Sequence, residues 1–430
     1  MRQSAGRTTT LRAAVLAVAL LALAGCSSSD DAQPADDAES TTTRDRDAGA
    51  GDGTPTRLRT EGATYVVPDP LPAGEPGDLL AATTEEPSEH LAGAERTQLL
   101  YLSEDTQGDP VAVSGVLLVP QGDAPEGGWP LISWGHGTTG VADVCAPSRT
   151  DNLFYNEYAQ EASSYLDAGY AVVATDYPGL GTPGGHAYLS GVDEGNAMVD
   201  AVRAARHLDP SIGSTWWAVG HSQGGQAALF ATRSAERAPE LELGGAVAIA
   251  PASGLELALP AILAGGVPAD LVYGTYVIAG LAAMDPTVEL ADELGPAGLE
   301  HLELLTEQGC LLDALPELEI DELDEIFDLS PERAIDLSAR VAAYGNPENE
   351  ATVGPVVVMQ GEEDHDIPLG LSQQLVRRLQ DKGADVELRT YPGLNHDTVL
   401  GPSICDRLAW LAAHGGPAAD GCVPYETDLS

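Results

Sequence analysis

One short motif in this chain has the residue types of a serine nucleophile. Residues 220–224 read Gly-His-Ser-Gln-Gly, after an apolar run at 215–219 and before a helix-like stretch at 225–230. A strand, a sharp turn and a helix in this order expose the Ser222 hydroxyl, and glycines flank the turn because a Cβ there would collide with a neighbouring element. A chain with 48 glycines can also produce the pattern by chance. The strand and helix around it favour the chemical interpretation, with His221 packed below the turn.

A serine hydroxyl is a weak nucleophile and needs a base, which in turn needs an acid to orient it. After such a turn the partners follow in the order Ser, Asp or Glu, His. The acidic turn at 360–368 follows a buried run, and within it Asp364 is the predicted acid and Asp366 the alternative. His396 follows the last predicted strand, 386–391, and is the predicted base. A solvated acidic turn is the non-catalytic interpretation of these carboxylates.

Acyl transfer at a serine also needs two N–H donors for the negative oxygen of the intermediate. The backbone N–H of Gln223, next to the nucleophile, is predicted to be one. The other is predicted in the loop 135–140, Gly-His-Gly-Thr-Thr-Gly, which follows a buried run. Gly137 and Thr138 are the candidates there, and Thr139 remains an alternative.

Strands and helices alternate around these motifs. Near-continuous apolar runs separated by helical patterns at 154–166 and 192–208 are typical of a parallel sheet with helices on both faces. The sequence therefore predicts an α/β fold with a mostly parallel sheet. The predicted strands are 98–102, 111–119, 131–134, 170–174, 215–219, 246–249, 356–359 and 386–391.

The segment at about 252–350 interrupts this alternation. It is rich in Leu, Ala, Glu and Asp and has helical patterns at 299–305 and 333–344. A stretch of this length is too long for a plain connection, so we interpret it as a helical cap inserted into one domain at 61–430. Ordinary crossover helices with long loops are the alternative.

The N-terminus resembles a bacterial lipoprotein signal. Three arginines precede an apolar stretch at 13–24, and the stretch ends in Leu-Ala-Gly before Cys26. We expect a signal peptide at 1–25, lipid on Cys26 that anchors the protein to the membrane surface, and a disordered tether at 26–60. An ordinary secretory signal with an incidental cysteine is the alternative. In both cases the protein is exported, and in the first it is a cell-envelope lipoprotein.

The formal net charge of −47 excludes a nucleic-acid partner, because phosphate neutralisation needs clustered Lys and Arg. Apart from Cys26, the chain has four cysteines, Cys145, Cys310, Cys405 and Cys422, which allow three disulfide pairings. Cys405 and Cys422 are close enough in sequence to staple the C-terminal tail. No Cys-x-x-Cys pair is present, so we expect no zinc or redox site. The predicted serine chemistry requires no metal and no organic cofactor.

Five motifs together resemble the secretory lipase family, which includes fungal lipase A. The similarity covers about Tyr65 to Cys422. The motifs are Pro-Gly-Asp at 76–78, His-Gly-Thr-Thr-Gly at 136–140, Cys-Ala-Pro-Ser at 145–148, Asp-Tyr-Pro-Gly at 176–179 and Gly-His-Ser-Gln-Gly-Gly at 220–225.

This resemblance implies an α/β-hydrolase fold with a helical cap, a Ser-Asp-His triad and hydrolysis of acyl esters. It also implies disulfides Cys145–Cys310 and Cys405–Cys422. The expected function is that of a lipid-anchored carboxylester hydrolase with an acyl-enzyme intermediate. Two alternatives stay open. One is a prolyl-type serine peptidase, because residues 176–181 also resemble loops of that branch; the other is a non-catalytic binding lipoprotein on the same scaffold.

Overall fold

The computed structural model describes residues 63–86, 88–264, 267–318, 325–418 and 421–425. The predicted signal peptide, Cys26 and the tether lie outside these ranges. No helix within the ranges combines the length and the hydropathy needed to cross a bilayer.

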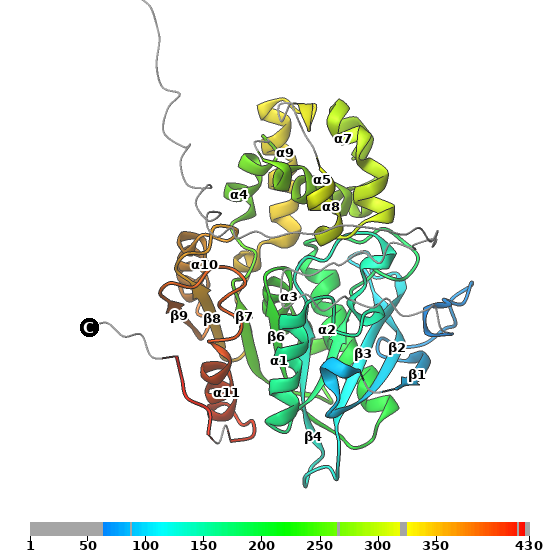
Figure 1. Ribbon diagram of the computed structural model, residues 1–430, viewed down its shortest axis with the longest axis vertical. Helices are drawn as coiled ribbons and strands as arrows, with labels where there is room; N and C mark the ends of the chain where they lie inside the picture. Colours follow the sequence, from blue (N-terminus) through cyan, green and yellow to red (C-terminus); the bar gives the residue numbers. More distant parts are fainter. Residues whose placement is uncertain (1–62, 87, 265–266, 319–324, 419–420, 426–430) are drawn as a thin grey trace, which may run out of the picture. The chain divides into compact units, whose positions relative to one another are not determined.

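The described residues form one mixed sheet of nine strands in the order β1-β2-β3-β5-β4-β6-β7-β8-β9 (Figure 1). Strands β4 to β9 run parallel to one another. Strands β1, β2 and β3 form an antiparallel edge, and β3 pairs with β5. The predicted class, a mostly parallel α/β sheet, is confirmed. The strands are β1 Leu79–Glu85, β2 Ala94–Glu104, β3 Pro110–Pro120, β4 Trp129–Gly135, β5 Ala171–Thr175, β6 Ile212–His221, β7 Glu242–Ile249, β8 Val356–Gly361 and β9 Val386–Tyr391.

Helices cover both faces of this sheet. On one face, side chains such as Val173 pack against α2 (Gly191–Leu208), α3 (Gln223–Ser234) and α10 (Leu369–Asp381). On the other face, Val172 and its neighbours pack against two further helices, α1 (Asn156–Asp167) and α11 (Ile404–Ala413). Burial on both faces explains why the central strands are apolar without alternation.

In chain order a group of helices follows β7 and precedes β8 (Figure 1). These helices bury an apolar core of their own, which also includes Tyr188 and Leu189. The predicted helical stretch at 299–305 is interrupted, because α7 ends at Glu300 and a short π-helix starts at Leu304. Apolar spacing predicts the buried face of a helix but not where its hydrogen-bond register changes. The elements are α4 Leu255–Ile262, α5 Pro268–Met284, α6 Leu290–Glu293, α7 Pro296–Glu300, the π-helix Leu304–Gln308, α8 Leu311–Glu317 and α9 Pro331–Gly345.

Two disulfides join distant parts of the described chain. Cys145, in the loop after β4, bonds to Cys310 at the start of α8, across 165 positions. Cys405 in α11 bonds to Cys422 and holds the tail, 17 positions later. These pairings are the ones that the family resemblance implies.

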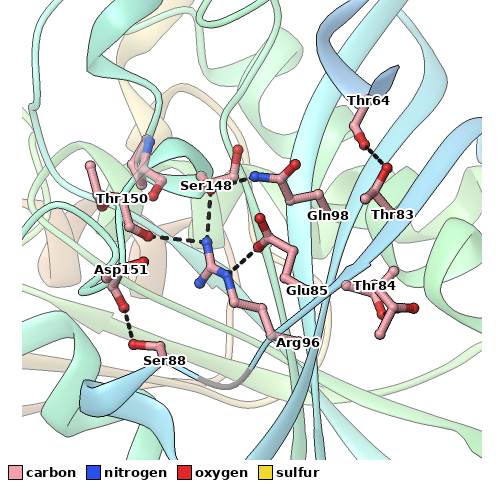
Figure 2. A network of polar contacts seen from close by, with 12 residues as sticks. Thr64, Thr83, Thr84, Glu85, Ser88, Arg96, Gln98, Ser148, Thr150 and Asp151 are labelled. Carbon is pink, nitrogen blue, oxygen red and sulfur yellow. Dashed lines mark hydrogen bonds and ion pairs between the residues drawn. The ribbon is translucent and has the colours of Figure 1, made fainter. Parts of the chain in front are cut away.

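A buried arginine fixes the loop that carries Cys145 to the antiparallel edge of the sheet (Figure 2). The guanidinium of Arg96, in β2, donates to Glu85 at 2.7 Å and to the carbonyl oxygens of Ser148 and Thr150 at 2.7 and 3.1 Å. Such charge-assisted bonds are strong when buried. The network therefore sets the path of the chain that enters α1.

Candidate active site

Ser222 lies in the sharp turn between β6 and α3. Its backbone has φ 57° and ψ −117°, a conformation that costs of order 1–3 kcal/mol for a residue other than glycine. The flanking glycines are required by space. A Cβ on Gly220 would lie 2.2 Å from the carbonyl oxygen of Gly224, and one on Gly224 would lie 1.9 Å from that of Gly135. The chain thus accepts a strained serine in order to expose its hydroxyl.

Asp364 and His396 meet at the carboxyl ends of the neighbouring strands β8 and β9. The imidazole Nδ1 of His396 donates to Asp364 Oδ2 at 2.8 Å, and Gln360 Nε2 donates to the same oxygen at 2.7 Å. Asp364 Oδ1 accepts the backbone N–H groups of Asp366 and Ile367 at 2.9 and 2.8 Å. Asp364 is buried and Asp366 is exposed. This geometry favours Asp364 over Asp366 as the partner of His396.

The surroundings of His396 favour its protonated form. Burial lowers the pKa of His396, but the hydrogen bond and the charge of Asp364, together with the charges of Asp366 and Asp397, outweigh burial and raise the pKa above its usual value. A ring held in this way can accept a proton and share the resulting charge with a carboxylate.

The oxygens of Asp364 and Asp366 and a ring nitrogen of His396 lie within 4.8 Å of one another, a spacing that could hold a metal ion. However, both oxygens of Asp364 already accept two N–H groups each. The hydrogen bonds account for this cluster, and it gives no support to a metal site.

Ser222 and His396 line one cavity of about 230 Å³. Strand ends, helix α1 and the inserted helices α5 and α8 contribute its walls. The apolar and aromatic wall residues are Phe154, Tyr155, Tyr158, Tyr273, Leu311, Leu312, Leu315 and Leu400. The cavity therefore joins the predicted nucleophile and base to an apolar compartment.

The loop after β4 also reaches this cavity, but Gly137 differs from the prediction. Its N–H donates to the hydroxyl of Tyr158 at 2.9 Å, and its carbonyl oxygen accepts from the ring of His136 at 2.7 Å. An N–H group already used in this way is not available to an oxyanion. The prediction that Gly137 supplies a donor is therefore not supported, because the hydroxyl of Tyr158 already accepts its N–H.

The hydroxyl and the carbonyl oxygen of Thr138 both form hydrogen bonds. Its hydroxyl bonds to that of Tyr188 at 2.6 Å, and its carbonyl oxygen accepts from Tyr155 at 2.9 Å. The alternative, Thr139, accepts the N–H of Leu311 at 2.7 Å and does not line the cavity. Among the hydrogen bonds of the described chain, none uses the N–H of Thr138. Thr138 is thus the better candidate donor.

Gln223 begins α3, where backbone N–H groups have no partner within the helix. Its side-chain amide donates to Glu194 Oε1 at 2.8 Å and to His186 Nε2 at 3.1 Å. Burial lowers the pKa of His186 to about 4, so the ring is neutral; its Nδ1 donates to the carbonyl oxygen of Pro178 at 3.0 Å, and Nε2 therefore accepts. Burial also raises the pKa of Glu194 well above its usual value. The hydrogen bonds from Gln223 and from the Leu189 N–H act in the opposite direction, but they do not cancel this rise. These contacts fix the residue whose N–H is predicted to face the oxyanion.

The sequence motifs do not indicate the tyrosines that hold the loop after β4, and the prediction that His221 packs below the turn is wrong. His221 is buried, but its ring contacts Tyr158 and His396 at the cavity rather than the packing below the turn. One available signal was that Tyr155 and Tyr158 are three apart in a predicted helix and so share a face.

Comparison with known proteins places this site in a family. A profile of the secretory lipase family matches residues 159–420. A probable inactive lipase of Mycobacterium tuberculosis is 26% identical in an alignment of 345 residues that covers 75% of this chain and 75% of its own. Candida antarctica lipase A in its closed state has the same fold, with a TM-score of 0.68 and 19% identity over 85% of this chain and 89% of its own.

A ligand-bound form of the rice cell wall degrading esterase LipA from Xanthomonas oryzae also shares the fold. It has a TM-score of 0.63 and 21% identity over 79% of this chain and 97% of its own. The sheet, the inserted helices and these similarities agree with the α/β-hydrolase fold. The chain belongs to the secretory lipase family.

Proposed function

We propose that this protein is a serine carboxylester hydrolase, a lipase or an esterase. The observation that carries the proposal is the hydrogen bond of His396 to buried Asp364, in a cavity that the base shares with Ser222 on its strained turn. Membership of the secretory lipase family supports the same chemistry.

In the proposed reaction Ser222 Oγ attacks the ester carbonyl carbon while His396 Nε2 takes the hydroxyl proton. Asp364 keeps the proton of the neutral ring on Nδ1 and stabilises the imidazolium. The carbonyl oxygen becomes negative and accepts the N–H groups of Gln223 and Thr138. His396 then protonates the leaving alcohol, and an acyl-enzyme remains on Ser222. Water repeats the sequence and releases the acid.

The walls of the cavity favour an uncharged ester. Aromatic and leucine side chains surround it, and Glu157, Asp366 and Asp397 add carboxylates. Lys and Arg are absent from its lining in the described chain. A negative field disfavours anionic ligands, so a neutral acyl ester of small volume is the proposed substrate class.

Replacing Ser222 by alanine tests this proposal. Hydrolysis of p-nitrophenyl acetate and labelling by a fluorophosphonate should both be lost, while circular dichroism stays that of the parent. Ser253→Ala is the matched control, because Ser253 is a buried serine whose hydroxyl has no partner in the described chain. Undiminished turnover by the Ser222 variant contradicts the assignment.

One observation favours a second candidate, a non-catalytic binding protein on the same scaffold. A relative that aligns with 75% of this chain is described as a probable inactive lipase. This candidate predicts that the parent protein hydrolyses no ester and that a fluorophosphonate leaves Ser222 unlabelled. Labelling at Ser222 with turnover excludes it.

Family membership and two disulfides indicate export to an oxidising compartment. We propose in addition that Cys26 carries the lipid that holds the protein at the membrane surface. The Cys26→Ser variant should then leave the membrane fraction and lose incorporation of labelled palmitate. Equal membrane association of both proteins contradicts the anchor.

A further inference from the structure

His221 makes two hydrogen bonds whose directions the structure determines. Its Nε2 lies 3.0 Å from the backbone carbonyl oxygen of His396, which can only accept, so Nε2 carries a proton. Its Nδ1 lies 3.0 Å from the hydroxyl of Tyr158. Burial, together with the charge of His396, lowers the pKa of His221 well below its usual value, against the bond to the His396 carbonyl. The neutral ring therefore accepts at Nδ1, and Tyr158 donates to it.

The hydroxyl of Tyr158 also accepts a bond, from the N–H of Gly137 at 2.9 Å. This approach depends on glycine, because a Cβ at position 137 would lie 2.4 Å from the tyrosine oxygen. The chain of bonds thus runs from the N–H of Gly137 through Tyr158 and His221 to the carbonyl of His396. It joins the loop after β4, helix α1, the last residue of β6 and the loop after β9.

We infer that Tyr158 and His221 form a positioning pair for the proposed reaction. The pair sets the tilt of the His396 ring and the position of the loop after β4, which carries the predicted oxyanion donor. The rings of His221 and His396 lie 4.6 Å apart, so a shift of the His221 ring changes the position of the His396 ring in the cavity that both share with Ser222. The pair also occupies the N–H of Gly137, whereas none of the hydrogen bonds among the described residues uses the N–H of Thr138, which lines the cavity. The inference rests on the proposed function, since it concerns the same site.

The Tyr158→Phe variant tests the pair, because it keeps the ring in the cavity wall and removes only the hydroxyl. We expect kcat for p-nitrophenyl acetate to fall by about tenfold, the effect of one lost buried hydrogen bond, with KM nearly unchanged. Tyr165→Phe is the matched control. Tyr165 is buried in the same helix, α1, and its hydroxyl has no hydrogen-bond partner in the described chain. Equal kcat values for the two variants overturn the inference.

A double-mutant cycle adds a readout that general loosening of the fold does not give. If the two residues act as one unit, the fold-loss of kcat in the Tyr158→Phe/His221→Phe double variant is smaller than the product of the fold-losses in the two single variants. Independent multiplication of the two effects overturns the pair.

Nitrogen-15 NMR of the parent protein separates this inference from the proposed function. At about pH 7, His221 should be neutral with its proton on Nε2. A charged ring, or a proton on Nδ1, overturns the pair whether or not the protein hydrolyses esters. Conversely, a parent protein without turnover contradicts the proposed function, whatever the NMR result.

Discussion

Replacing Asp364 by asparagine tests the predicted acid with a change of one group. Oδ1 of the carboxylate accepts two backbone N–H groups, those of Asp366 and Ile367. Oδ2 accepts from the side chains of Gln360 and His396. An amide has one oxygen for these two pairs of donors, so asparagine must leave one pair facing its NH₂ group.

The two orientations of the asparagine differ in cost. When NH₂ faces the backbone, two partly buried N–H groups lose their acceptor. When it faces the side chains, Gln360 still has the carbonyl oxygens of Gly361 and Ile367. His396 can then move its proton to Nε2 and accept at Nδ1. The second orientation is favoured by about 2–6 kcal/mol, at about 1–3 kcal/mol for each orphaned N–H.

In this orientation the nitrogen of His396 that must take the Ser222 proton is already protonated. Each 1.4 kcal/mol corresponds to about tenfold in rate, so kcat/KM should fall by about 30-fold to about 10⁴-fold. Hydrolysis of p-nitrophenyl acetate measures the loss, and the Ser222→Ala variant gives the background. Asp366→Asn is the control and should cost less than about tenfold, because an exposed carboxylate acts only through its field.

Two results refute this reasoning. One is an Asp364→Asn variant with nearly the activity of the parent. The other is an Asp366→Asn variant that is as damaged as the Asp364 variant, which would assign the acid role to Asp366.

Three further predictions concern pH, the cap and the turn. Asp366→Asn removes a charge that raises the pKa of His396, so that pKa should fall and the base should stay neutral to lower pH. The acid limb of the pH profile of kcat/KM should therefore move to lower pH, and a limb that does not move contradicts the electrostatics. Serines at both Cys145 and Cys310 should lower the free energy of unfolding by up to about 5 kcal/mol, because the bridge spans 165 positions, and a urea titration with an unchanged midpoint opposes this. Gly224→Ala places a Cβ 1.9 Å from the carbonyl oxygen at the end of β4 and should abolish ester turnover, so activity equal to the parent's contradicts the geometry of the turn.

Features that depend on local sequence were predicted well. The central strands are buried on both faces, so continuous apolar runs indicate them in the sequence. Strands β5 and β8, for example, are buried throughout. Strand β1 was missed. It reads Leu-Leu-Ala-Ala-Thr-Thr-Glu with mixed exposure and lies at the sheet edge, where its pairing with β2 holds it. Such a strand depends on a distant partner rather than on its own pattern.

The same distinction applies to the candidate site. Ser222 and His396 stand in turns directly after strands, where chain order and turn residues indicate them. The donor at Gly137 could not be judged in this way, because its N–H is taken by Tyr158, 21 positions later. Which hydroxyl reaches which amide depends on how α1 packs against the sheet.

The anchoring of α8 has a practical consequence for redesign of this protein. Leu311, the first residue of α8, lines the cavity, and its N–H donates to the carbonyl oxygen of Thr139. The preceding residue, Cys310, forms the disulfide with Cys145. Enlarging the compartment through this helix would therefore also disturb the loop beside the nucleophile, and selectivity and turnover would change together. Tyr273 projects into the same space from α5, away from that double attachment, and is the better position at which to alter substrate choice alone.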